Sequence, residues 1–129
     1  MAKSDKNAAN LIESEADAIV ALGERLRNSP ELGFREFKTG DILEAELRRS
    51  GAEVERGLAV TGLRASLGPK DGPEILLVAD MDALPTTGAP GGIAHSCGHS
   101  AQMAACVGAF RALVESGLPE REEIGRAHV

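Results

Sequence analysis

The sequence predicts a layered α/β fold, and three observations indicate it. Apolar residues recur at helical spacing in two stretches near the N-terminus, strand-like pieces follow between residues 52 and 80, and a third helical stretch begins near residue 99. The order helix, helix, strand, strand, helix is typical of a domain in which helices pack on a sheet. A chain of 129 residues has the length of one such domain.

The first helix is predicted to end at Asn28-Ser29, because the residue before Pro30 is disfavoured in the α region. Residues 1–10 are small and polar and are expected to form a flexible N-terminus. The helical stripe after them consists of Ile12, Ala16, Ile19, Gly23 and Leu26. A second helix is predicted from about residue 36 to residue 50, with Gly51 beyond its end. Its apolar positions are Phe37, Ile42, Leu43, Ala45 and Leu47.

Strands are predicted over residues 52–55 and 59–67, and the second of them alternates apolar and polar residues as a half-buried strand does. The composition of residues 69–73 predicts a turn. Residues 75–79 form a continuous apolar run, which predicts a strand that is buried on both faces of a sheet.

The region from residue 85 to residue 96 is rich in Gly, Thr and Pro and predicts an irregular loop. The last helix is predicted over residues 99–116, with Gly117 beyond its end and Cys106 as a small buried hydrophobic residue. One stripe of this helix consists of Met103, Val107, Phe110 and Val114.

Composition and charge argue against several classes of function. Fourteen basic and twenty acidic residues give a net charge of −6, and no Lys/Arg cluster forms a groove for nucleic acid. Three Phe and no Trp or Tyr leave no surface on which bases could stack. No apolar run is long enough for a membrane span, and no apolar segment follows the N-terminus as in a signal peptide. We therefore expect a cytoplasmic protein whose partner is a small molecule or another protein.

The residues that can bind a metal or move a proton concentrate between residues 80 and 99. Cys97 and His99 stand at the predicted start of the last helix, where the helix dipole favours a thiolate, the form that binds zinc. Gly98 gives the backbone the freedom to turn both side chains toward one ion. Two alternatives stay open, namely a buried Cys beside a capping or surface His, and a nucleophile–base pair of thiol and imidazole.

Asp80 and Asp82 end the apolar run, and ligands of α/β sheets gather outside the carboxyl ends of strands. Aspartates also end strands for a structural reason, since their side chains bond to nearby backbone. His95 either orients a ligand, contacts a substrate or is a solvated loop residue. Glu31 and Glu36 are expected to be acidic residues of a helix's first turn rather than catalytic groups.

Three blocks stand in order along the chain: Ser29-Pro30-Glu31-Leu32-Gly33-Phe34-Arg35-Glu36, Leu77-Val78-Ala79-Asp80-Met81-Asp82-Ala83-Leu84-Pro85 and His95-Ser96-Cys97-Gly98-His99. With them the sequence resembles the N-terminal part of the M20 family of metallohydrolases and peptidases. The similar branch is the amidohydrolase branch, which includes aminoacylases, hippurate hydrolases and aminobenzoyl-glutamate hydrolases. The resemblance covers about residues 11–118, and the last two blocks together are its specific part.

The resemblance implies that Cys97 and His99 are ligands of a two-metal centre that holds zinc or manganese. Asp82 matches a carboxylate near the metals and is the catalytic candidate of this chain. The implied reaction is hydrolysis of the amide bond of an N-acyl or aminobenzoyl amino-acid conjugate, with a Glu as general base. The implied fold is a zinc-peptidase-like layered domain with a central mixed sheet flanked by helices. Family members carry an inserted dimerisation domain, so the parent protein is expected to be a homodimer.

Several positions depart from the family pattern. Ser100 and Gln102 stand where the block usually continues with Asp and His, and the family's paired Glu residues and two further His ligands have no counterpart here. We expect residues 11–122 to be the N-terminal part of a truncated catalytic domain that is inactive by itself. Residues 123–129 equal one reading-frame translation of a common sequencing adapter and are expected to be a non-native tail. The alternative from another class is a small non-catalytic α/β binding module in which the thiol and the imidazole are structural.

Overall fold

The computed structural model describes residues 7–68, 71 and 74–117, together with the backbone of residues 127 and 128. Within these residues lie four α-helices and one 3₁₀ turn: α1 (Ala8–Ser14), α2 (Ala16–Arg27), α3 (Phe37–Arg49), η1 (Pro90–Gly92) and α4 (His99–Ser116). The strands are β1 (Glu53–Leu58), β2 (Gly62–Leu67), β3 (Ile75–Leu76), β4 (Leu84–Pro85), β5 (Ile93–Ala94) and β6 (Ala127–His128).

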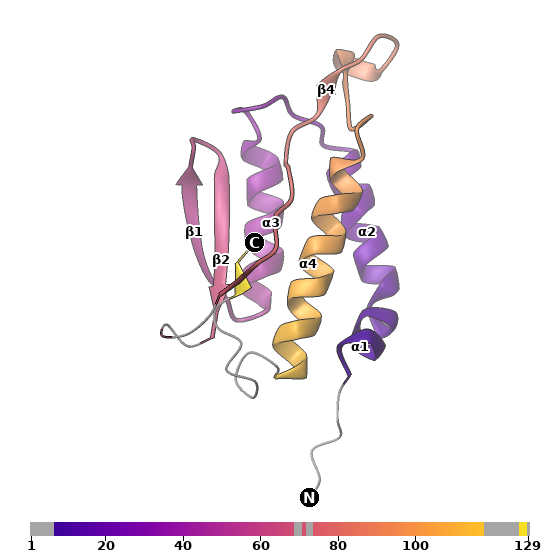
Figure 1. The fold of residues 1–129 in the computed structure, drawn as a ribbon. Coiled ribbons are helices and arrows are strands. Elements are labelled where there is room, and N and C mark those ends of the chain that lie inside the picture. The colour runs from indigo at the N-terminus through magenta and orange to yellow at the C-terminus, as the bar shows by residue number, and fades with distance from the viewer. Residues whose placement is uncertain (1–6, 69–70, 72–73, 118–126, 129) are drawn as a thin grey trace, which may run out of the picture.

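The main sheet has four strands in the order β1-β2-β6-β3. β1 and β2 form an antiparallel hairpin, β2 pairs with β6 antiparallel, and β3 pairs with β6 parallel. β4 and β5 form a separate antiparallel ribbon at the upper end of the molecule (Figure 1). This mixed sheet with helices beside it confirms the predicted α/β fold.

The core lies between the helices and one face of the sheet. In Figure 1, α4 runs between α2 and α3, and α3 stands between α4 and the β1–β2 hairpin. Leucines of α2 and α3 meet the apolar side of α4 in one buried cluster, which consists mainly of Leu22, Leu26, Leu43, Leu47, Met103, Val107 and Phe110. Removing these side chains from water is the main force that holds the helices together.

The N-terminal helical stretch forms two helices rather than the predicted one. Glu15 links α1 to α2. α1 begins at Ala8, so residues 8–10 are helical, whereas residues 1–6 lie outside the described part of the chain. The predicted apolar stripe is wrong at Ile12, which is 41% exposed, and at Ala16, which is exposed as well. The buried residues of α2 are Leu22, which the stripe missed, and Leu26.

The two longer helices have the predicted positions and ends. Gly51 follows α3 with a φ of 80°, and Gly117 follows α4 with a φ of 69°. Both values lie in the left-handed region, which ends helices and favours glycine. The prediction for α3 is wrong at Phe37 and Ala45, which are exposed while Leu47 of the same helix is fully buried.

The β1–β2 hairpin differs from the two predicted strand pieces in its bounds. β1 extends to Leu58, and β2 begins at Gly62 instead of residue 59, because Ala59, Val60 and Thr61 form the turn. Ala59 and Val60 have φ values of 45° and 83°. Leu58 pairs with Gly62, so the turn has three residues, and positive φ values in a turn favour Asn and Gly. Because Ala and Val carry no signal for this turn, the sequence did not predict it.

The predicted strand over residues 75–79 is wrong in length and in burial. Only Ile75–Leu76 is a strand, and Ile75, Leu76 and Val78 are 44%, 61% and 73% exposed. Leu77, Ala79 and Met81 pack against the core, so the segment alternates between a covered side and an open side. The predicted turn lies mostly outside the described residues, as does the predicted non-native tail except for the backbone of residues 127 and 128.

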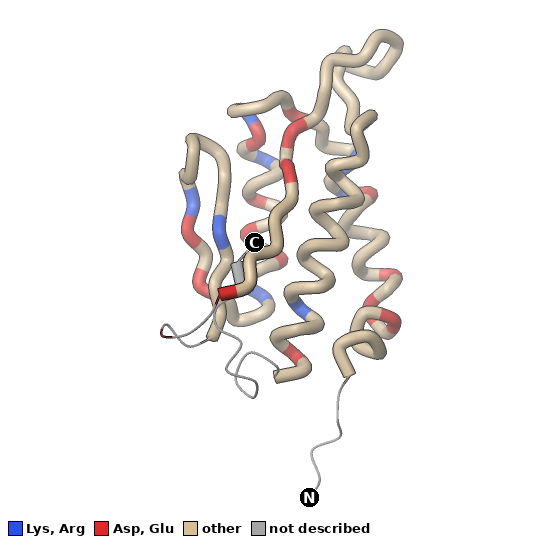
Figure 2. Tube along the Cα trace, viewed as in Figure 1, with Lys and Arg blue, Asp and Glu red and all other residues tan. Residues whose placement is uncertain are grey.

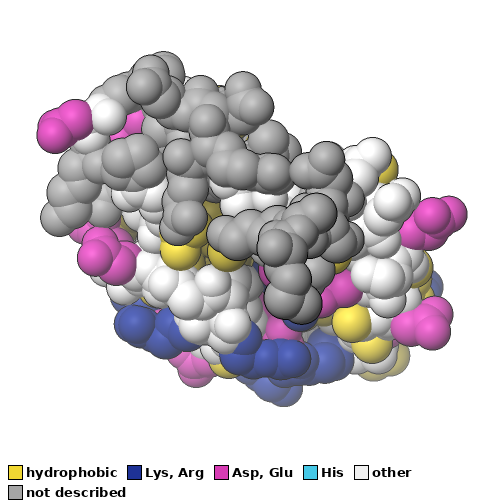
Figure 3. Space-filling view, turned by 90° about the horizontal axis from the view of Figure 1, so that it is seen from below, with side chains coloured by type: hydrophobic (Ala, Val, Ile, Leu, Met, Phe, Trp, Pro, Cys, Tyr) yellow, Lys and Arg dark blue, Asp and Glu magenta, His cyan; other side chains and the backbone are white. Residues whose placement is uncertain are grey.

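Ion pairs connect α2, α3 and α4. Glu46 is buried and pairs with Arg25 at 3.0 Å, with Arg49 at 3.1 Å and with Arg111 at 3.6 Å. Seen from below, basic and acidic side chains lie next to each other at one edge of the molecule (Figure 3). Because α2, α3 and α4 each supply a charge to the Glu46 network, it fixes their relative positions.

Candidate metal centre

Asp80 and Asp82 lie on a segment that is held in place by the connector between α2 and α3. Leu32 and Ala83 form a parallel bridge, and the Ala83 N–H donates to the Glu31 carbonyl oxygen over 2.8 Å. Figure 2 shows acidic positions in succession along this segment, followed by a loop without charged residues. The backbone of the connector therefore sets the position of both aspartates.

Glu31 and Glu36 have structural partners. The Glu31 carboxylate accepts from the Thr39 N–H at 2.6 Å, from the Thr39 hydroxyl at 2.7 Å and from the Lys38 N–H at 3.2 Å. It thus accepts from the first turn of α3, although Glu31 precedes the helix and, contrary to the prediction, is not itself a residue of that turn. Glu36 is buried and accepts from the Thr61 hydroxyl at 2.5 Å, so it contacts the hairpin instead of the helix terminus.

Cys97 and His99 approach the same atom. The Cys97 thiol donates to the Asp82 carbonyl oxygen at 3.9 Å, and His99 Nδ1 lies 2.8 Å from that oxygen. Gly98, between them, has a φ of 90° and precedes the first residue of α4. This left-handed conformation turns the two side chains to one side, as the sequence predicted from the glycine.

The contacts of His99 define its tautomer. A carbonyl oxygen only accepts, so Nδ1 carries the proton that it donates to Asp82, and Nε2 keeps its lone pair. The Asp82 side chain adds a second acceptor, with Oδ1 at 3.0 Å from Nδ1. Histidines that ligate metals have this arrangement, in which the second ring nitrogen is fixed by a carbonyl or carboxylate.

The free nitrogen of His99 faces a carboxylate. Its Nε2 lies 3.7 Å from Asp80 Oδ2, which is too long for a hydrogen bond. Two zinc ligands with bonds of about 2.1 Å at a tetrahedral angle stand about 3.4 Å apart. The donor chemistry and this spacing fit a cation shared by the imidazole and the carboxylate, with the exposed Cys97 thiol nearby.

The site nevertheless provides only part of a metal centre. Among the described residues, no three side chains of His, Cys, Asp or Glu are arranged to hold one ion. Because His99 Nδ1 is taken by Asp82, its proton-accepting nitrogen faces Asp80, which does not support a Cys97–His99 nucleophile–base pair. Ser100 is buried, and the carboxylate beside the His99 ring is that of Asp82.

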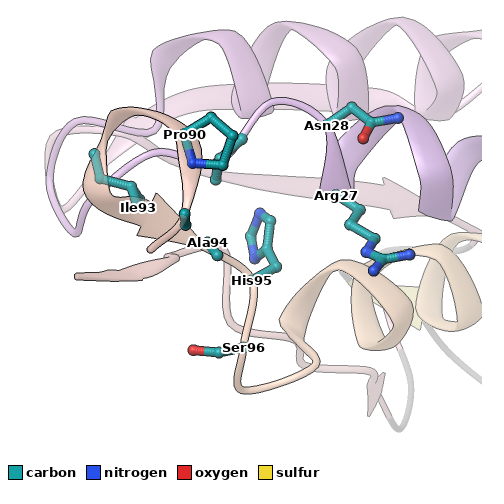
Figure 4. A pocket seen from close by; sticks show the side chains of 9 residues that line it. Arg27, Asn28, Pro90, Ile93, Ala94, His95 and Ser96 are labelled. Atoms are coloured by element: carbon teal, nitrogen blue, oxygen red, sulfur yellow. The ribbon is translucent and has the colours of Figure 1, made fainter. Parts of the chain in front are cut away.

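His95 lies in a cavity of about 580 Å³ between the end of α2 and the loop before α4 (Figure 4). Both of its ring nitrogens are buried, and neither has a hydrogen-bond partner within the described part of the chain. Burial lowers the pKa of the His95 imidazole, and the neighbouring His99 lowers it further, whereas the Asp82 carboxylate raises it. His95 is therefore not the solvated loop residue that the sequence left open.

The structure adds two residues that the sequence did not indicate as part of a site. Arg27 and Asn28 border the His95 cavity from the end of α2. Asp80, which the sequence did indicate, faces the free nitrogen of His99. Nothing in the sequence pattern shows that the end of this helix meets a loop 60 or more positions later. Cys106 is half-buried in α4, close to its predicted role.

No helix of the described residues is both long and apolar enough to cross a membrane. No protein-family model matches the sequence.

Individual proteins do match it. The chain is 34% identical over 121 residues to IAA-amino acid hydrolase ILR1-like 5 of Arabidopsis thaliana, covering 85% of this chain and 28% of that protein. It is 35% identical over 123 residues to N-acetyl-L-cysteine deacetylase of Bacillus subtilis, covering 88% of this chain and 29% of that protein. It thus spans less than a third of the length of these two curated relatives.

The fold has a counterpart among solved structures. The YXEP protein of Bacillus subtilis, a dinuclear metal-binding peptidase from the M20 family, matches 90% of this chain and 35% of its own with a TM-score of 0.74 and 28% identity. The helix order, the mixed sheet and the Cys-Gly-His block at the start of α4 all agree with the resemblance found in the sequence. The chain belongs to the M20 family of metallohydrolases and corresponds to a part of the length of its members.

Proposed function

We propose that this chain carries one side of the metal centre of an amidohydrolase that cleaves N-acyl amino-acid conjugates. The observation that carries the proposal is the convergence of the Cys97 thiol and the His99 imidazole on Asp82, with the second imidazole nitrogen left free. Cys97 and His99 are the proposed metal ligands. The described residues provide no further histidine ligand and no general base, so hydrolysis by the chain alone is not expected.

Each residue has a proposed role. His99 binds through Nε2, and Asp82 fixes its ring and makes the imidazole a better donor. Cys97 binds as the thiolate. Asp80 is placed to be a further ligand or to hold a metal-bound water. A bound divalent ion, zinc or manganese, would polarise the amide carbonyl and make water a stronger nucleophile at neutral pH.

The proposed substrate follows from the relatives' names. One relative is named an IAA-amino acid hydrolase and another an N-acetyl-L-cysteine deacetylase, so both names describe a conjugate of an amino acid. We therefore propose a small amide of an amino acid, N-acyl or aminobenzoyl, as the substrate of the parent protein. A homodimeric parent and a cytoplasmic location remain part of the proposal.

Cobalt binding tests the metal ligands. Cobalt(II) replaces zinc and gives a near-ultraviolet charge-transfer band when a thiolate ligates it. We expect this band with the wild-type chain and its loss in Cys97→Ser. The cobalt affinity of His99→Ala should be lower by about tenfold or more, because replacing even a residue that hydrogen-bonds to a metal ligand lowers metal affinity by about 10–100-fold. Cys106→Ser is the matched control and should keep the band. A band that depends on Cys106, or on neither cysteine, would refute the proposed ligands.

The alternative is a non-catalytic α/β binding module in which Cys97 and His99 are structural. It is favoured by one observation, the lack of a three-residue metal cluster among the described side chains. Thermal unfolding without metal separates the two functions. A structural role requires Cys97→Ser to destabilise the metal-free chain, whereas a metal ligand that is exposed should leave the metal-free melting temperature unchanged.

A further inference from the structure

The cavity beside His95 has the composition of a small-molecule site. Its volume of about 580 Å³ lies within the usual range of ligand pockets. It is lined by the end of α2, the connector after it and the loop before α4, through Arg27, Asn28, Pro30, Ala89, Pro90, Ile93, Ala94, His95 and Ser96. In Figure 4 the His95 ring lies between the Arg27 side and the Pro90–Ala94 side of the cavity.

His95 offers hydrogen bonds that nothing in the described chain takes up. A neutral imidazole has one N–H donor and one acceptor nitrogen, and both nitrogens of His95 are buried without a partner. Buried polar groups in proteins are nearly always paired. A ligand that accepts a hydrogen bond from His95 would remove the cost of the unpaired donor.

The polar side of the cavity favours an anion. Arg27 brings a guanidinium whose one ion pair in the described chain, with Glu24, is long at 3.7 Å and exposed to solvent. Asn28 brings an amide, and none of the described lining residues is acidic, although the chain has a net charge of −6. A guanidinium and an imidazole N–H together match a carboxylate.

The other side of the cavity is apolar. Pro30, Ala89, Pro90 and Ile93 line it and can contact an aliphatic or aromatic group. A ligand that fits both sides therefore has a carboxylate next to an apolar group.

We propose that this cavity binds the free carboxylate of an N-acylated amino acid, with Arg27 and His95 as donors to the carboxylate and the proline-rich wall against the amino-acid side chain. The identity of the ligand rests on the proposed function. Binding of a carboxylate to the cavity does not.

The location of the cavity agrees with a substrate subsite. His95 and Ser96, which line it, directly precede Cys97 in the chain. A molecule whose carboxylate is held here can extend its amide toward Cys97 and His99.

Imidazole NMR of the chelator-treated, metal-free chain tests the proposal. The probes are N-acetyl-leucine and N-acetyl-leucinamide, which differ only in that the second has no carboxylate. We expect the acid to shift the His95 ring signals in a saturable way and the amide to leave them unchanged. Arg27→Gln should weaken binding of the acid by about tenfold or more, because a charge-assisted bond is lost. Arg64→Gln, on β2, removes the same charge from an exposed pair and should bind as the wild type.

Three results would overturn the proposal: equal binding of acid and amide, an unchanged His95 signal, or equal affinity in Arg27→Gln. Because the Arg27 side chain is exposed, replacing it should leave the stability of the fold unchanged. No metal and no hydrolysis enter the measurement. Cobalt binding at Cys97 without carboxylate binding would therefore reject the cavity alone, and carboxylate binding without cobalt binding would reject the metal ligands alone.

Discussion

His99 and Asp82 are joined twice, once through the Asp82 carbonyl oxygen at 2.8 Å and once through its carboxylate at 3.0 Å, both on Nδ1. The main chain and the side chain of Asp82 thus both contact Nδ1 of His99. A substitution of Asp82 removes only the second contact, so the main chain should still select the tautomer that leaves Nε2 free.

We therefore expect Asp82→Asn to weaken cobalt binding by about tenfold, at the low end of the range for partners of metal-binding histidines. Asp80→Asn removes the carboxylate that faces Nε2 and should have an effect at least as large, if Asp80 shares the ion. Asp41→Asn is the control, because Asp41 is exposed and pairs with Arg56 away from the site. Isothermal titration of the three variants measures these affinities. Equal affinity in Asp82→Asn and wild type would show that the main-chain contact suffices.

The two cysteines should differ in reactivity. Cys97 is exposed, whereas burial raises the pKa of the Cys106 thiol, so less of Cys106 is thiolate at any pH below that pKa. At pH 7, we expect iodoacetamide to modify Cys106→Ser, which retains Cys97, about tenfold faster than Cys97→Ser. The rate at which iodoacetamide modifies Cys106 should keep rising above pH 9, whereas the rate of an unperturbed thiol levels off there. Intact-mass spectrometry follows both reactions, and equal rates would contradict the burial of Cys106.

The bond from Thr61 to Glu36 should stabilise the fold. Thr61→Val keeps the shape of the side chain and leaves the buried Glu36 carboxylate without its donor. The expected loss in the free energy of unfolding is about 1–3 kcal/mol, measured by urea denaturation. Thr86→Val removes an exposed hydroxyl contact and should change stability by less than about 0.5 kcal/mol. Similar losses in both variants would mean that Glu36 finds another donor.

Two glycines should respond to alanine in opposite ways. A Cβ at Gly62 would stand 2.6 Å from the Leu58 carbonyl oxygen, so the hairpin backbone would have to move. A Cβ at Gly23 would stand 3.5 Å from Ala104 Cβ, an ordinary contact, inside α2. We expect Gly62→Ala to lower the melting temperature and Gly23→Ala to raise the free energy of unfolding by up to about 1 kcal/mol. A neutral Gly62→Ala would show that the turn can relax.

Periodicity predicted α3 and α4 well because strong local signals agreed there, with apolar stripes followed by Gly51 and Gly117. It failed for residues 75–79, since an apolar run does not reveal whether one or both of its faces are covered. It also failed at the Ala59-Val60 turn, where the paired strands impose positive φ on residues that rarely adopt it.

The candidate site was predictable in its residue types and not in its contacts. Cys97, Gly98 and His99 are adjacent, so their chemistry could be recognised from the chain alone. That Asp82 contacts His99 depends on how the segment after β3 returns to the start of α4, which is tertiary information. Arg27 and His95 line one cavity although they stand 68 positions apart in the sequence, and this proximity likewise depends on tertiary packing.

Glu31 acts at two places at once. Its carboxylate accepts from the first turn of α3, and its carbonyl oxygen accepts from Ala83, the residue after Asp82. Replacing its side chain would release the connector and displace the aspartate that orients His99. In a screen for loss of the proposed hydrolase activity, Glu31 variants would then lose activity as variants of a metal ligand do, although the Glu31 carboxylate contacts α3 and not the Cys97–His99 pair. Only a structural readout of the α3 terminus would tell the two apart.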